Sequence, residues 1–346
     1  MDVQDQAESD QTITVATQDG VDMRFNSAEL MQSVNNGAAF DDLSKNYIEP
    51  AVKVLISNIE ADVLAYCTKQ TYNLAGTAGT AITTLDVPGK ARAKLNQQLA
   101  PKDKQRAIQM DSVGMGALVN GMAAYFNPSN AIGEQYREGL ISRTGMADYY
   151  ENERVWTMTT GADHTTVTTD ASAAVTDGGT NITISGGTVT VGSVFTVAGV
   201  YDCHPETKAA YPHLKQFVIT AGTSGALTVS PATVLTGAKK NVVSSSGGTL
   251  ATTDFNSQVV TMVGAASTSY VQPIMYHKEA FQFVTADLPL YDAQKCVRRV
   301  QDGLSMRVWM DSDIRNDELL MRIDILYGMK ALRPQWACRM IGSANA

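Results

Sequence analysis

The sequence predicts an α+β fold that combines one long helix with strand-rich stretches, and three observations support this. Apolar residues recur at spacings of three and four between about residues 50 and 71. Residues 165–253 hold short β-branched runs separated by Gly-containing turns. Strand-like runs dominate again from residue 258 onward. With 346 residues, 44% of them hydrophobic, the chain can form about two domains or one domain with a large insertion.

Charge and cysteine content exclude several classes of protein. The chain carries 27 Lys and Arg against 35 Asp and Glu, a formal charge of −8, which argues against non-specific DNA binding through clustered positive charge. Its 4 cysteines form no CxxC pair, so we expect a reduced, intracellular protein without a disulfide framework. The N-terminus lacks the pattern of a secretory signal. No uninterrupted apolar run approaches the ~20 residues that a membrane helix needs, so we expect a soluble protein.

The first element is strand-like. Residues 12–25 contain two runs in which apolar and polar residues alternate, with Asp19-Gly20 between them. Val15 belongs to the first run, and Met23 and Phe25 to the second. The stretch is either a hairpin that turns at Asp19-Gly20 or one long bent strand.

The long helix is expected from Pro50 to about Thr71 and would span about 33 Å. Pro50 lies where proline either starts a helix or kinks a longer one. Shorter helices are expected over Pro88–Leu99, after a cap at Asp111, and along 132–140. The apolar face of the long helix comprises Ile48, Val52, Leu55, Ile59, Val63 and Tyr66.

The segment 165–253 differs in composition from its surroundings, because it holds 19 Thr and 11 Gly but only 8 charged residues. It is expected to be an all-β insertion, with a two-residue hairpin turn at residues 185–188 and a strand over 188–191. The last strands are expected at Leu319–Tyr327 and Ala337–Ile341, with a turn at Gly328.

The sequence contains none of the common catalytic or ligand-binding motifs. The chain has no G-x-S-x-G elbow and no complete phosphate-binding or dinucleotide-binding loop. Cys203-His204 with His213 lacks the spacing of a metal site. The acidic residues from Asp311 to Glu318 fit a solvated turn or a subunit contact better than a pair of catalytic carboxylates. We therefore expect no catalytic, cofactor-binding or metal-binding residues, and a structural protein rather than an enzyme.

Two C-terminal stretches carry a family resemblance. Met275–Pro289 contains His277-Lys278-Glu279-Ala280-Phe281, and Gly303–Pro334 contains Gly303-Leu304-Ser305-Met306-Arg307-Val308 followed by an Asp-x-Leu-Tyr-Gly motif and Arg-Pro. Weaker matches occur in order upstream, at 22–30, 136–139, 195–200 and 204–208. Together they resemble the major capsid (coat) proteins of tailed bacteriophages related to the short-tailed Salmonella phage P22, over nearly the whole chain.

The resemblance implies the Hong Kong ninety-seven (HK97) type capsid fold, with a peripheral domain on a long spine helix, an axial domain, and an extended loop called the E-loop. It places a partial E-loop strand and lead-in at 1–40, and the peripheral domain with the spine helix at 41–100. The axial domain falls at 101–164 and 254–300, on either side of the β-rich insertion at 165–253. The return strands to the peripheral domain would be 301–346. The N-terminal arm of the family is expected to be missing.

The implied function is formation of an icosahedral shell around a phage double-stranded DNA genome. Partners would be copies of the chain in pentamers and hexamers, with scaffolding and portal proteins as further candidates and no sequence-specific DNA contact. The protein would belong to the virion and assemble in the bacterial cytoplasm. Val15, Met23 and Phe25 are the expected inter-subunit contacts, with an apolar face that is buried only in the assembly.

Two other interpretations stay open at this point. An encapsulin-like, non-viral cage would share the fold but enclose enzymes. A β-rich adhesive or carbohydrate-binding protein would use the segment 165–253, although few aromatic residues occur there to stack on sugars.

Overall fold

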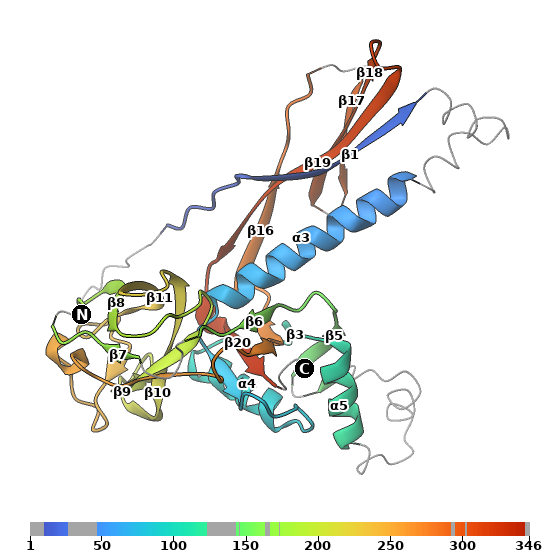
Figure 1. Ribbon diagram of the computed structural model, residues 1–346. Helices are drawn as coiled ribbons and strands as arrows, with labels where there is room; N and C mark the ends of the chain where they lie inside the picture. Colours follow the sequence, from blue (N-terminus) through green and yellow to red (C-terminus); the bar gives the residue numbers. More distant parts are fainter. Residues whose placement is uncertain are drawn as a thin grey trace, which may run out of the picture. The chain divides into compact units, whose positions relative to one another are not determined.

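The computed structural model describes residues 10–26, 47–122, 143–144, 146–162, 167–172, 174–291, 295–301 and 303–342, and these fall into two compact units (Figure 1). The hairpin unit comprises Met1–Val63 and Gln282–Leu332, and the core unit comprises Leu64–Phe281 and Arg333–Ala346. Each unit is therefore built from segments that are distant in sequence. The expected helix along 132–140 lies outside the described residues.

The hairpin unit contains a five-stranded sheet. Its main path runs β1-β19-β18-β17, and β16 pairs with β19. Along this path each neighbouring pair is antiparallel. The strands are β1 (Thr17–Asn26), β16 (Phe281–Ala286), β17 (Cys296–Gln301), β18 (Leu304–Asp313) and β19 (Glu318–Ala331).

Gly20 and Gly328 both lie inside strands, which agrees with the long-strand alternative at Gly20 and contradicts the turn predicted at Gly328. β1 is one continuous strand that pairs with β19 from Thr17 to Asn26, so no turn occurs at Asp19-Gly20. A Cβ on Gly20 would lie 2.8 Å from the Ile323 carbonyl oxygen. Gly328 also lies within β19, where a Cβ would overlap the carbonyl oxygen of Thr14. Both positions lack a side chain because another segment of backbone approaches closely.

The long helix agrees with its prediction. Helix α3 spans Glu49–Gln70, and its first fifteen residues belong to the hairpin unit. Alternation along the strands turns every second side chain of β1, β18 and β19 towards this helix. The resulting apolar cluster is centred on Leu55, Ile59, Ile323, Ile325 and Tyr327, with Ile48, Val21, Met23, Val52, Val63, Phe283, Leu304, Met306, Val308 and Met329 packed against it.

The core unit contains a six-stranded mixed sheet in the order β2-β20-β15-β3-β5-β4. Its strands are β2 (Leu74–Gly76), β3 (Arg106–Met110), β4 (Arg143–Thr144), β5 (Ala147–Glu151), β15 (Ile274–His277) and β20 (Ala337–Ile341). Helices α4 (Asp86–Gln97) and α5 (Ser112–Met122) contribute to the apolar cluster that this sheet shares. Both helices start within two residues of their predicted positions.

The Thr/Gly-rich part of the core unit folds as a seven-stranded sheet, β12-β9-β10-β11-β8-β7, with β13 paired to β9. The strands are β7 (Thr168–Thr169), β8 (Gly179–Ser185), β9 (Val194–Cys203), β10 (Ala210–Ala221), β11 (Ala226–Thr233), β12 (Val242–Val243) and β13 (Val260–Met262). A separate pair joins β6 (Thr157–Thr159) and β14 (Ser269–Val271), and short 3₁₀ helices cover Thr252–Phe255 and Pro334–Trp336.

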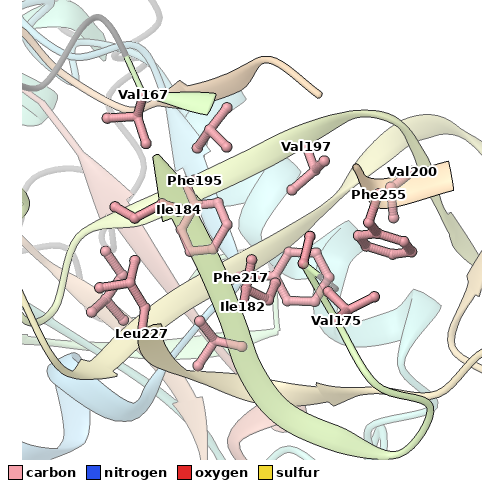
Figure 2. Close-up of a cluster of buried hydrophobic side chains, with 14 of the residues drawn as sticks. Val167, Val175, Ile182, Ile184, Phe195, Val197, Val200, Phe217, Leu227 and Phe255 are labelled. Carbon is pink, nitrogen blue, oxygen red and sulfur yellow. The ribbon is translucent and has the colours of Figure 1, made fainter. Parts of the chain in front are cut away.

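Figure 2 shows the apolar core of this sheet, with the rings of Phe195 and Phe217 stacked at 5.7 Å. The core includes Val260, so the packed unit continues past residue 253. The predicted hairpin turn at 185–188 is wrong, because β8 pairs with β7 and β11 and residues 188–191 form no strand. Nonlocal pairing has overridden the local Gly-Gly signal.

A buried ion pair joins β9 to β10. Lys215 Nζ lies 2.8 Å from Asp202 Oδ1, and the two side chains are 3% and 4% exposed. Burial opposes ionisation of Asp202, but the Lys215 ammonium and neighbouring His213 outweigh this and lower its pKa to about 2.

The six segments expected from the family resemblance remain a prediction. The hairpin unit and the core unit divide the chain differently, since the boundary at Val63 falls inside the segment 41–100.

Candidate assembly surfaces

Exposed apolar side chains are concentrated in the hairpin unit. Among the described residues, ten large apolar side chains of this unit are exposed, against five in the larger core unit. Solvated apolar groups gathered in one region indicate an interaction surface. The ten are Tyr47, Val54, Ile56, Leu290, Tyr291, Val297, Val300, Met310, Ile314 and Leu320.

Strand β17 is an exposed edge of this sheet. Within the described residues it pairs with β18 alone. Val297 and Val300 are 55% and 63% exposed, and Arg298 and Arg299 between them are also exposed. An edge with free backbone groups and apolar side chains can accept a strand from another chain.

The turn between β18 and β19 forms an apolar tip. Ile314 is 96% exposed there. The Asp313 carboxylate accepts hydrogen bonds from the backbone N–H of Arg315 at 2.9 Å and from Asn316 Nδ2 at 2.8 Å. These bonds fix the turn locally, as Asp side chains commonly do. The tip therefore presents Ile314 on an ordered support.

A groove of about 350 Å³ lies beside the same two strands. Its lining combines apolar side chains with two acidic ones and an arginine: Met23, Trp309, Leu320, Met321, Asp22, Asp311 and Arg322. Arg322 Nε and Nη2 lie 2.5 and 2.7 Å from the two oxygens of Asp22, and this hydrogen bonding lowers the pKa of Asp22. Lys295 Nζ lies 2.6 Å from Asp311 Oδ1 and lowers the pKa of that carboxyl.

A buried ion pair supports the sheet near this groove. Arg307 Nε and Nη2 donate to Asp324 Oδ1 and Oδ2 at 2.9 and 2.5 Å, and the side chains are 4% and 2% exposed. Gln18 Nε2 also donates to Asp324, and Arg307 Nη1 donates to the carbonyl oxygen of Pro289. The hydrogen bond to Asp324 raises the pKa of Arg307. This network ties β1, β18 and β19 together.

The three predicted contact residues lie in different environments. Val15 and Met23 are half-buried, and Met23 lines the groove. Phe25 is 7% exposed and packs edge-on against Tyr47 at 5.4 Å. The expectation that this ring is buried only in an assembly is therefore corrected, because the chain itself covers it. The inter-subunit role of the other two stays a prediction.

Asp311 and Glu318, two of the acidic residues that were considered for catalysis, form ion pairs with basic residues. Asp311 pairs with Lys295, and Glu318 pairs with Arg24 at 3.2 Å. In the part of the chain that the structure describes, no group of three His, Cys, Asp or Glu residues is placed to hold a metal ion. Within that part, too, no helix has the length and apolar character to cross a membrane.

Sequence reasoning missed the groove, since its walls come from strands about 300 residues apart. The turn between β18 and β19 lies where a solvated turn or a subunit contact was predicted, from Asp311 to Glu318, but that prediction rested on the acidic residues and did not single out Ile314.

Comparison with known families decides the identity of the chain. A family model described as "P22 coat protein - gene protein 5" matches residues 39–342. The chain belongs to the P22 coat protein family. This confirms the resemblance seen in the sequence: the protein is a phage major capsid protein, and its copies form the shell. Membership of a structural coat family implies a non-enzymatic role, and it replaces the encapsulin-like and adhesive interpretations.

Solved structures similar to this coat protein come from several phages. A protein of Mycobacterium phage Che8 is 11% identical, covers 97% of this chain and 76% of its own, and has a TM-score of 0.47. The capsid structure of cyanophage P-SCSP1u gives 9% identity, coverage of 95% and 73%, and a TM-score of 0.46. The mature capsid of bacteriophage PhiM1 gives 10% identity, coverage of 98% and 76%, and a TM-score of 0.44. No curated protein matches the sequence.

Proposed function

We propose that this coat protein has the HK97-like capsid fold and closes, through its own surfaces, into an icosahedral shell of pentamers and hexamers around phage double-stranded DNA. The observation that carries the assembly mechanism is the concentration of exposed apolar side chains in the hairpin unit. Many weak contacts of this kind act together in a closed shell, so each need not be strong.

The partners of the shell follow from the same proposal. The net charge of −8 suits a container that does not hold its genome through non-specific positive charge, and we propose no sequence-specific DNA contact. Scaffolding and portal proteins would join the coat protein during assembly in the bacterial cytoplasm. Val15 and Met23 would contact a neighbouring subunit, while Phe25 stabilises β1 from within.

The test is assembly of the purified full chain. Size-exclusion chromatography and negative-stain electron microscopy at high protein concentration should show closed particles of uniform size. A chain that stays monomeric at every concentration would overturn assembly through its own surfaces.

A matched pair of variants tests whether the hairpin unit carries the contacts. Val300→Asp places a charge on β17, where the side chain is 63% exposed, and should reduce the yield of particles. Val259→Asp makes the same change at a side chain 59% exposed in the core unit and should leave the yield unchanged. Equal yields from the two variants would contradict the assignment of the surface.

A further inference from the structure

We propose that the β18–β19 tip of one coat protein docks into the groove of a neighbouring copy, with Ile314 against its apolar lining residues and Arg315 beside Asp311. This inference rests on the proposed self-assembly and names the contact that carries part of it. Tip and groove both belong to the hairpin unit, so every copy supplies one of each. Such a head-to-tail contact can continue from copy to copy until a ring or shell closes.

The tip has the properties of a docking element. Ile314 is 96% exposed, so nearly its whole side chain is available for burial. The two hydrogen bonds to Asp313 hold the turn in one conformation before binding. Ordering the turn in advance lowers the entropy lost when two chains associate.

The groove cannot receive the tip of its own chain. Its wall on β18 includes Trp309 and Asp311, which pair with Arg322 and Leu320 on β19. Ile314 lies five residues beyond Trp309, about 16 Å along an extended strand. The two strands stay paired up to Asp313 and Glu318, so the tip continues away from the groove. A second copy is the natural source of an identical tip.

One charged contact between the tip and the groove is available. In the described part of the chain the guanidinium of Arg315 has no hydrogen-bond or ion-pair partner. At the groove, Asp311 uses Oδ1 to accept from Lys295 and from the backbone N–H of Ser312. Its Oδ2 remains available to a cation from outside, and the carboxyl is half exposed. An arginine that accompanies Ile314 into the groove would meet this acceptor.

The dimensions also favour a tip over a longer segment. A groove of about 350 Å³ is at the small end of ligand pockets, and it suits one or two side chains. The apolar residues that line it are Trp309, Leu320, Met23 and Met321. An aliphatic side chain inserted there loses its contact with water and gains close packing.

Charge substitution on each side tests the contact. Ile314→Glu and Leu320→Lys should each raise the concentration needed for half-maximal assembly by about tenfold or more, since each charge opposes burial in an apolar contact. The two substitutions combined in one chain should restore assembly, because Glu on every tip would then meet Lys in every groove. Val113→Glu is the control: it changes an 80% exposed valine of the core unit and should have no effect.

A cysteine trap identifies the contact directly. The four natural cysteines are free and buried, which keeps background cross-linking low. The variant carrying both Ile314→Cys and Leu320→Cys, mildly oxidised after assembly, should give a ladder of disulfide-linked oligomers on a non-reducing gel. Either single cysteine variant should give no ladder.

Each contrary outcome has a definite meaning. Wild-type particles with no ladder from the double cysteine variant, or with unchanged assembly of Ile314→Glu, would overturn this inference and leave the proposed function standing. Loss of monomer stability in Leu320→Lys together with normal assembly of Ile314→Glu would show that the chain's own residues fill the groove. Failure of the wild type to form any particle would instead overturn the proposed function.

Discussion

The Arg307–Asp324 pair provides a sharp test of what stabilises the hairpin unit. Replacing Asp324 by Ala removes the carboxylate that accepts two hydrogen bonds from Arg307, at 2.9 and 2.5 Å. The guanidinium would remain 4% exposed or nearly so, with the Pro289 carbonyl as its remaining acceptor. Removing one partner of a buried ion pair costs about 3–5 kcal/mol, because the other charge is left without compensation.

Urea unfolding of the unassembled protein measures this loss. Trp309 lies 5.6 Å from the Arg307 guanidinium, so its fluorescence should follow the loss of the network. We expect the free energy of unfolding to fall by about 3–5 kcal/mol, a factor of about 10² to 10³ in the ratio of folded to unfolded protein. The slope of the unfolding free energy against urea concentration (the m-value) should stay the same, since the surface exposed on unfolding changes little.

Two further variants control for simpler explanations. Arg24→Ala breaks the exposed pair with Glu318 between β1 and β19 of the same sheet, and should cost no more than about 1 kcal/mol. Replacing both members of the buried pair, with Arg307→Met and Asp324→Leu in one chain, should recover most of the lost stability. If Asp324→Ala costs no more than Arg24→Ala, the buried pair does not have the stabilising role assigned to it.

Three other predictions concern packing and charge. Asp202→Asn should lower stability at neutral pH by leaving Lys215 buried without its partner, and should flatten the pH profile. The native carboxyl has a pKa of about 2, below its ordinary value, so its contribution is present above about pH 4 and lost as the pH falls through 2; urea titrations at several pH values that gave parallel profiles would refute this. Phe217→Ala should cost about 3–5 kcal/mol in thermal or urea unfolding, because it opens a cavity in the core in Figure 2; a loss below about 1 kcal/mol would mean that the core collapses to fill the cavity. Gly328→Ala should displace the backbone at Thr14 and speed limited proteolysis there, and an unchanged cleavage rate would contradict the close approach.

Local sequence patterns determined the elements whose causes are local. Helix α3 begins at Glu49 and ends at Gln70, close to the predicted limits, because proline, spacing and polarity all act within a few turns. Glycines did not determine the local structure where a distant segment was involved. The turn predicted at Gly328 is wrong, and the sequence left a hairpin and a continuous strand both open at Gly20; each glycine makes room for another strand or for the chain near Thr14.

For the assembly surfaces, too, the sequence determined some features and the tertiary structure decided the others. Sequence motifs were sufficient to identify the family, and alternation placed Met23 and Phe25 on one face of a strand. They could not show that β1 pairs with β19, about 300 residues away, and so could not reveal which of these side chains the chain covers itself. The groove exists only through that pairing. Local composition therefore determined the helices, the β-rich segment and the protein family, whereas long-range strand pairing alone decided which apolar side chains remain exposed for contact with other copies.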